Sequence, residues 1–221
     1  MAQSQPENYL AVPPTGKGPA VLVLHAWWGL NDFFRSFCDR LAKEGFVALA
    51  PDLYAGKIAR TIEEAEQVQS QWDEEHEVPS ILLPAVEDLS KHPAITGQGL
   101  GVVGFSMGGY WALWLALTKP ELVRSVTLFY GTNGGGGDFR QSKAAYLGHF
   151  AEHDPYEDGS VVQALEKNLK GANRPATFYT YPGTGHWFFE KDRPEAYQAE
   201  AARLAWERTL AFLKGSSTAS K

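Results

Sequence analysis

The sequence predicts an α/β fold, with a mostly parallel central sheet and helices on both faces. Short apolar runs alternate with amphipathic stretches along the chain, as in parallel strands that are joined by crossover helices. The apolar runs show little polar alternation, which indicates strands buried on both faces. A chain of 221 residues can build one sizeable core, so we expect a single domain.

Six apolar runs are expected to form the strands of the sheet. They cover residues 20–26, 46–54, 99–105, 125–131, 144–152 and 176–183. The amphipathic stretches predict helices near residues 31–44, 61–75, 78–92, 107–118, 158–170 and 194–214. We expect the N-terminal segment, the glycine-rich run and the tail to be flexible; these are residues 1–18, 131–138 and 215–221.

The composition argues against several classes of partner. Lys and Arg number 20 against 26 Asp and Glu, so a net charge of -6 gives no electrostatic reason to expect nucleic acid. The only cysteine, Cys38, excludes an internal disulfide, and its place on an apolar helical stripe indicates a buried packing thiol. The N-terminus has no signal-peptide pattern, and no apolar run approaches the roughly 20 residues of a membrane helix. We expect a cytoplasmic protein with neither membrane nor nucleic-acid partners.

The stretch GLGVVGFSMGGYW contains two overlapping motifs. As G-x-G-x-x-G it is similar to a dinucleotide-binding loop, through Gly99, Gly101 and Gly104. As G-x-S-x-G it is similar to a nucleophile elbow, centred on Ser106. The first would indicate an oxidoreductase and the second a hydrolase.

The elbow is the better interpretation, because the turn comes at Ser106. The glycines of a dinucleotide loop follow the strand, whereas Gly99 and Gly101 belong to the predicted strand itself. The acidic residue expected about 20 positions later is matched only by Glu121, at a helix end. A sharp strand-to-helix turn needs small residues two positions before and after the nucleophile, and Gly104 and Gly108 stand there.

A serine nucleophile needs a base and an acid further along the chain. His186 follows a predicted strand and a glycine-rich turn, where the sites of α/β proteins lie, which favours it over the other histidines: His25, His76, His92, His149 and His153. Asp154 ends the preceding strand, which Pro155 terminates. The alternative acids are Asp138, Glu152, Glu157 and Asp158, of which the last two are interpreted as first-turn charges of the next helix.

The oxyanion that forms during acyl transfer needs two N–H donors. We expect the backbone amides of Trp27, in the loop after an early strand, and of Met107, which follows the nucleophile. Three aromatic residues are candidates for a substrate pocket: Trp28, Trp187 and Phe188. The side chains of Trp27 and Trp28 are equally compatible with ordinary core or lid positions.

With these residues assembled, the chain resembles the dienelactone hydrolase family of α/β-hydrolases. The similarity runs from about residue 20 to residue 213 and includes HAWWGLND, APDLYAGK, VGFSMGG, AEHDPY and GTGHWFF. It implies the α/β-hydrolase fold and a catalytic triad of Ser106, Asp154 and His186. It also implies oxyanion amides at Trp27 and Met107.

Two features depart from the pattern of the dienelactone enzymes. Those enzymes carry a cysteine nucleophile that is assisted by a glutamate, where this chain has Ser106 and Ala26. They also clamp a substrate carboxylate with an arginine shortly after the histidine, where this chain has Glu190, with Arg193 further on. We therefore expect a serine hydrolase of carboxylesterase or thioesterase type that acts on a small, mainly uncharged acyl ester without metal or organic cofactor. The alternatives are a peptidase or acyltransferase on the same triad, or a binding protein that retains the fold.

Overall fold

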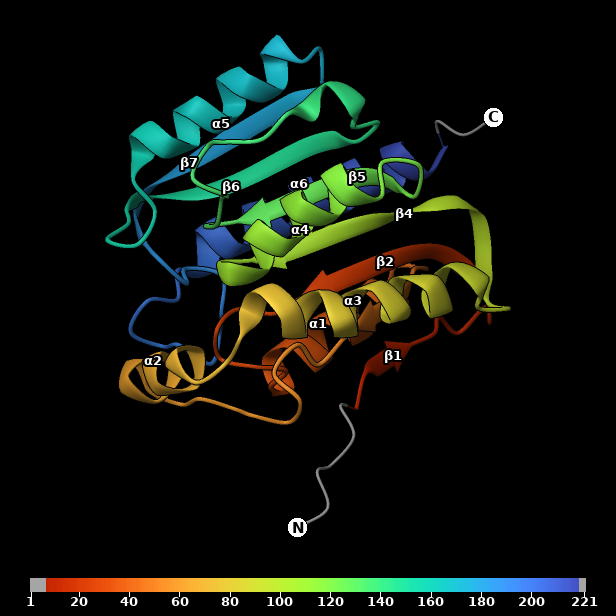
Figure 1. Cartoon of the computed structure of the whole chain (residues 1–221), viewed down its shortest axis with the longest axis horizontal. Coiled ribbons are helices and arrows are strands. Elements are labelled where there is room, and N and C mark those ends of the chain that lie inside the picture. Colours follow the sequence, from red (N-terminus) through yellow and green to blue (C-terminus); the bar gives the residue numbers. More distant parts are fainter. Residues whose placement is uncertain (1–6, 219–221) are drawn as a thin grey trace. The chain divides into compact units, whose positions relative to one another are not determined.

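The computed structural model describes residues 7–218 (Figure 1). The chain divides after Gly97 into two compact units. Each unit has strands covered by helices. The expectation of a single domain stays a prediction. Among the described residues, no helix combines the length and the apolarity that are needed to cross a lipid bilayer.

The first unit contains three strands in the order β1-β3-β2. They are β1 (Tyr9–Ala11), β2 (Gly18–Leu24) and β3 (Val47–Ala50). β2 and β3 pair in parallel, and β1 pairs antiparallel with β3. The side chains of β2 and β3 are largely buried, as the uninterrupted apolar runs of the sequence predict.

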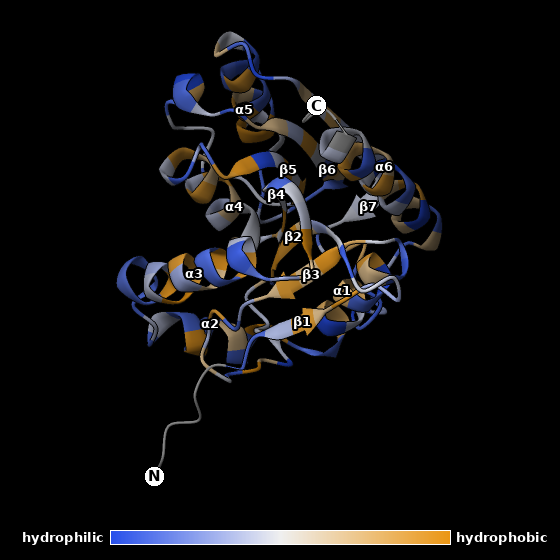
Figure 2. Ribbon diagram, turned by 90° about the vertical axis from the view of Figure 1, so that its right-hand side faces the viewer, coloured by the Kyte–Doolittle hydropathy of each residue, from blue (hydrophilic) through white to orange (hydrophobic). Residues whose placement is uncertain are grey.

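Three helices complete the first unit: α1 (Asp32–Lys43), α2 (Ile62–Ser70) and α3 (Glu74–Lys91). α1 and α3 lie on opposite faces of the three strands (Figure 2). Asn31 caps the N-terminus of α1, and its side chain accepts hydrogen bonds from the amides of Phe33 and Phe34. Cys38 is fully buried on the inner side of α1, which confirms the predicted packing thiol.

The second unit contains four parallel strands that lie side by side in chain order. They are β4 (Ile95–Phe105), β5 (Val123–Phe129), β6 (Ala145–His153) and β7 (Ala176–Gly185). The carboxyl ends of parallel strands meet at one edge of a sheet. The loops after these four strands are therefore neighbours, although up to 80 residues separate them along the chain.

Helices cover both faces of the second unit (Figure 2). α4 (Met107–Thr118) and α5 (Gly159–Gly171) lie on one face, where they pack on β5 and β7. α6 (Ala199–Thr218) packs on β5 and β6 from the other face. A short 3-10 helix, η1 (Phe139–Gln141), ends the glycine-rich loop.

The N-terminal segment contains an element that the sequence analysis missed. β1 lies within the expected flexible segment 1–18, and the Tyr9 hydroxyl donates a hydrogen bond to Asp39 of α1. At the other end, α6 continues to Thr218, beyond the expected helix end at 214. Residues 1–6 and 219–221 lie outside the described part, and the flexibility of both termini stays a prediction.

Candidate active site

Ser106 occupies a sharp turn between β4 and α4. It is the single residue between Phe105, which ends β4, and Met107, which begins α4. Its φ of 49° and ψ of -115° are uncommon for a residue with a side chain, and such strain is concentrated at functional sites. The turn presents the serine hydroxyl at the carboxyl edge of the strands, as the elbow motif predicts.

Two glycines make room for this turn. A Cβ on Gly104 would overlap the carbonyl oxygen of Gly108, because the chain doubles back on itself around the serine. A Cβ on Gly131, in the loop after β5, would overlap the carbonyl oxygen of Ser106. The sequence analysis anticipated the first requirement but assigned Gly131 only to a flexible loop. The turn after β5 thus packs directly against the backbone of Ser106.

Ser106, His186 and Asp154 form one continuous chain of hydrogen bonds. The distance from Ser106 Oγ to His186 Nε2 is 2.9 Å. His186 Nδ1 lies 2.7 Å from Asp154 Oδ2 and 2.9 Å from Oδ1. A carboxylate only accepts hydrogen bonds, so it selects the tautomer with the proton on Nδ1 and leaves Nε2 to accept from the serine hydroxyl.

The Asp154 carboxylate is itself held in place by the turn that follows β6. Its Oδ1 accepts hydrogen bonds from the backbone amides of Tyr156, at 2.9 Å, and Glu157, at 3.0 Å. The side chains of Asp154 and His186 are each 3% exposed, so water competes little for their contact. The carboxylate is thereby aimed at the imidazole.

The competing acids have other partners. Glu152 accepts from the amide of Gly183, Asp138 pairs with Arg140, and Asp158 caps the N-terminus of α5. The interpretation of Glu157 as a first-turn charge of the next helix was wrong. α5 begins only at Gly159, and the Glu157 side chain turns back to accept hydrogen bonds from Thr132.

The competing histidines in the same unit are also engaged elsewhere. His149 is buried within β6, between the hydroxyls of Tyr181 and Thr209. His153 lies 3.3 Å from Glu152 with a largely exposed side chain. Among the histidines of the second unit, His186 is therefore the one that contacts Ser106.

The two amides that were expected to bind an oxyanion lie in different units. Met107 is the first residue of α4, at the end of the helix whose dipole favours negative charge. Trp27 follows β2 in the first unit. A common oxyanion site for both amides stays a prediction.

Aromatic side chains surround the His186 ring. Tyr156 and Trp187 have ring centroids 5.1 Å and 5.0 Å from it, and their own rings lie 5.1 Å apart. Tyr156 is 48% exposed, whereas Trp187 is 8% exposed. The sequence analysis missed Tyr156, although its place two residues after the acid was an available signal.

The other two pocket candidates are interior residues. Phe188 is fully buried and packs on the rings of Tyr130 and Tyr181. Trp28 is 1% exposed and packs edge-to-face on Trp27 in the first unit. Contact of either side chain with a substrate stays a prediction.

Beneath His186 lies a buried pair of a phenol and a carboxylate. The Tyr130 ring lies 4.9 Å from the imidazole, and its hydroxyl donates a 2.6 Å hydrogen bond to Glu190. Burial and the nearby Glu190 charge hold the pKa of Tyr130 well above its usual value, so the phenol keeps its proton. Glu190 is fully buried, so its carboxylate is not available at the protein surface.

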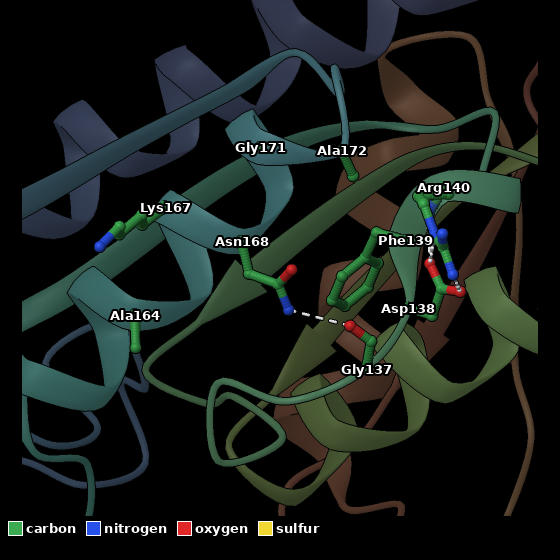
Figure 3. Close-up of a pocket in the computed structure, with 9 residues that line it drawn as sticks. All are labelled: Gly137, Asp138, Phe139, Arg140, Ala164, Lys167, Asn168, Gly171 and Ala172. Carbon is green, nitrogen blue, oxygen red and sulfur yellow. Dashed lines mark hydrogen bonds and ion pairs between the residues drawn. The ribbon is translucent and has the colours of Figure 1, made fainter.

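A cavity of about 570 Å³ lies between η1 and α5 (Figure 3). Its lining includes Arg140, which pairs with Asp138, and Asn168, which donates to the carbonyl of Gly137. Ser106, Asp154 and His186 are not part of this lining. The cavity is therefore separate from the hydrogen-bonded chain.

The fold is that of known α/β-hydrolases. The crystal structure of a "Putative Dienelactone Hydrolase" from Klebsiella pneumoniae subsp. pneumoniae superposes with a TM-score of 0.80 at 24% identity. It covers 95% of this chain, and 92% of its own chain is covered. The predicted α/β-hydrolase fold, with a mostly parallel sheet and helices on both faces, is confirmed.

Comparisons of sequence give the family. A protein of Bradyrhizobium sp named "Probable 2-oxo-3-(5-oxofuran-2-ylidene)propanoate lactonase" is 33% identical over 220 residues, covering 93% of this chain and 88% of the relative. A "Putative carboxymethylenebutenolidase" of Aquifex aeolicus is 31% identical, covering 94% and 92%. The model of the Dienelactone hydrolase family matches residues 7–217. The chain therefore belongs to the dienelactone hydrolase family.

Proposed function

We propose that this protein is a serine hydrolase that cleaves a small, mainly uncharged acyl ester or thioester. The observation that carries the proposal is the unbroken hydrogen-bonded chain from Asp154 through His186 to the Ser106 hydroxyl. Such a chain activates a hydroxyl that is otherwise a poor nucleophile.

The reaction begins with the attack of Ser106 Oγ on the carbonyl carbon. His186 Nε2 takes the hydroxyl proton, and Asp154 stabilises the imidazolium that forms. The amides of Met107 and Trp27 hold the oxyanion. His186 then returns the proton to the leaving oxygen or sulfur, and an acyl-serine remains. Water, deprotonated by the same imidazole, releases the acid and restores the serine. Every reacting group belongs to the protein, the substrate or water, so the mechanism as proposed uses no cofactor.

The residues near His186 favour an uncharged acyl compound. The position that would carry an arginine in the dienelactone enzymes is Glu190, which is buried and bonded to Tyr130. Tyr156 and Trp187 instead offer aromatic surface beside the imidazole. Two relatives are named as a lactonase and a carboxymethylenebutenolidase. These names support the proposed cleavage of an acyl–oxygen bond, which in a lactone lies within a ring. Because Ala26 supplies no carboxylate, we expect turnover of simple aryl and alkyl esters to exceed that of dienelactone.

A fluorophosphonate probe tests the nucleophile. It reacts covalently with an activated serine, so intact-protein mass spectrometry should show one adduct on the wild type and none on Ser106→Ala. Hydrolysis of p-nitrophenyl esters should disappear in the same variant. Labelling that persists in Ser106→Ala would overturn the assignment, and an unlabelled, inactive wild type would favour a binding protein.

A substrate panel tests the reaction class. Esters of graded chain length, the matching thioesters, an anilide and dienelactone should be compared by kcat/KM. Higher values for the anilide would favour a peptidase, and transfer to an added alcohol in preference to water would favour an acyltransferase. A preference for dienelactone would contradict the expectation that the missing carboxylate at Ala26 disfavours this substrate.

Activity in a cytosolic fraction would support the expected location in the cytoplasm.

A further inference from the structure

Glu157 makes a two-point contact with Thr132, 25 residues earlier in the chain. The backbone amide of Thr132 donates to Glu157 Oε2 at 2.8 Å, and the Thr132 hydroxyl donates to Oε1 at 2.6 Å. Thr132 is 8% exposed and Glu157 is half-buried, so the contact is partly shielded from water. Both carboxylate oxygens of Glu157 are thereby committed to a single residue.

On one side, this contact holds the turn that supports the nucleophile. Gly131, next to Thr132, lies so close to Ser106 that a Cβ on it would overlap the serine carbonyl. The following residues continue the turn, since the amide of Gly134 donates to the Thr132 hydroxyl at 3.1 Å. A displacement of Thr132 would therefore shift Gly131 and, with it, the backbone of Ser106.

On the other side, the same glutamate holds the acid. The amide of Glu157 donates to Asp154 Oδ1 at 3.0 Å, the oxygen that also lies 2.9 Å from His186 Nδ1. The backbone of Glu157 thus orients Asp154, while its side chain holds the turn under Ser106. Glu157 thus connects Ser106 and Asp154, the two ends of the series of hydrogen bonds through His186, without being a member of that series.

A second anchor of the same loop lies away from the catalytic residues. Asn168 of α5 donates from Nδ2 to the carbonyl of Gly137 at 2.9 Å (Figure 3). It also donates to the carbonyl of Gly135 at 3.3 Å. This anchor holds the glycine run but contacts neither Ser106 nor Asp154. Asn168 therefore offers a matched control for loss of loop anchoring alone.

We propose that Glu157 is a positioning residue, which fixes the spacing between Ser106 and Asp154 and so keeps both within reach of His186. The proposal rests on the serine hydrolase function given above. A misplacement of reacting groups by about 1 Å can cost on the order of 10²-fold in rate, so a clamp of this kind has a measurable effect.

The clamp needs the ionised carboxylate. Thr132 supplies two donors, and only a carboxylate accepts both well; the glutamine amide has one acceptor, so its NH₂ group would face a donor. Burial raises the pKa of Glu157, the two hydrogen bonds from Thr132 lower it, the nearby Asp154 charge raises it and His186 lowers it, and the net direction is upward. Protonation of Glu157 therefore weakens the clamp, in addition to the loss of base function when His186 is protonated.

The test is a double-mutant cycle with Glu157→Gln and Thr132→Val, measured by steady-state ester hydrolysis. We expect each single variant to lower kcat about tenfold with KM changed less than about threefold, because positioning acts on the transition state. The double variant should lose no more than the worse single variant, because both single variants disrupt the same contact of the Thr132 hydroxyl with the Glu157 carboxylate. Thr132→Ser should restore the wild-type kcat, and Asn168→Ala should keep it. Losses that multiply in the double variant, or a wild-type kcat in folded Glu157→Gln, would overturn the proposal.

A readout that does not require turnover separates this proposal from the proposed function. The proton shared by His186 Nδ1 and Asp154 is observable by NMR at low field. Glu157→Gln should shift or broaden this signal, and Asn168→Ala should leave it unchanged. If the wild type hydrolyses no ester while the signal still responds to Glu157→Gln, the proposed function fails and the clamp stands. If Glu157→Gln does not fold, Thr132→Val carries the test, and an unchanged signal in that variant rejects the clamp.

Discussion

Two buried histidines in the second unit have opposite surroundings. His149, within β6, is bonded to two neutral hydroxyls, from Tyr181 and Thr209. His186, after β7, is bonded to a carboxylate on one nitrogen and to a serine hydroxyl on the other. The carboxylate stabilises an imidazolium, whereas neutral hydroxyls in a desolvated site do not. The histidine inside a strand is thus part of the core, whereas the histidine after a strand end has the surroundings that the proposed base requires.

The lowered pKa of His149 agrees with this contrast. Burial lowers the pKa of His149 to about 3, and the positive charge of Arg208 contributes. The Arg208 guanidinium lies 3.8 Å from the centre of the Tyr179 ring and also donates to the Tyr181 hydroxyl. The surroundings of His149 therefore keep its imidazole neutral and disfavour the protonated form.

The largest expected effect distinguishes the two histidines directly. His186→Gln should lower kcat by at least about 10³-fold, since it removes the base, while His149→Gln should stay within about threefold when folded. Steady-state hydrolysis at pH 7.5, with circular dichroism as a folding control, measures both. Comparable losses in the two variants would abolish the distinction.

The next effect concerns the acid. Asp154→Asn keeps the volume but removes the charge and favours the wrong imidazole tautomer, so we expect kcat to fall by about 10² to 10⁴. Folding should persist, and labelling by fluorophosphonate should slow. A variant that stays near the wild-type rate would show that His186 is oriented by another group.

A stability measurement sharpens the other half of the comparison. The folded pKa of His149 lies below that of an unfolded histidine, so the unfolded chain binds a proton that the folded chain excludes. The contribution of His149 to the free energy of unfolding is fully present above about pH 6.5. It falls by about 1.4 kcal/mol per pH unit as the pH drops towards the pKa of the folded state. Between pH 6.5 and pH 5, His149→Gln should therefore lose about 2 kcal/mol less unfolding free energy than the wild type. Urea denaturation at both pH values measures it, and an unchanged slope would mean that His149 is not held neutral.

The smallest expected effect is a control in the acid loop. Asp158 caps α5 through a 2.7 Å bond from the amide of Ser160, and asparagine is an equally good cap. Asp158→Asn should therefore leave kcat within about threefold and shift Tm little. A collapse of activity in Asp158→Asn, with Asp154→Asn near wild type, would place the acid on the other side of Pro155.

Much of the fold was predictable because its signals are local. The strands β4, β6 and β7 each overlap an expected strand of the sequence, and Ser106, Asp154 and His186 directly follow them, after residues 105, 153 and 185. Strand order then brings them to one edge without further information. β1 was missed because three residues of half-exposed edge strand carry no periodic pattern.

The residues that were missed depend on contacts between distant segments. Glu157 was misassigned because it lies two residues before the start of α5 at Gly159, and its partner Thr132 lies in another loop. Gly131 is one of many glycines in its loop, and only the approach of the Ser106 backbone distinguishes it. Such pairings are set by tertiary packing, which no spacing along the sequence encodes.

The most direct test of the central claim is to trap the acyl group on the enzyme. The wild type should be mixed with p-nitrophenyl acetate, quenched in acid within the first turnover and mapped by peptide mass spectrometry. We expect one acetyl group on the peptide that contains Ser106, less of it in Asp154→Asn, and none in Ser106→Ala. Acetylation of another residue, or turnover in Ser106→Ala at the wild-type rate, would contradict the account of Ser106 as a nucleophile activated by His186.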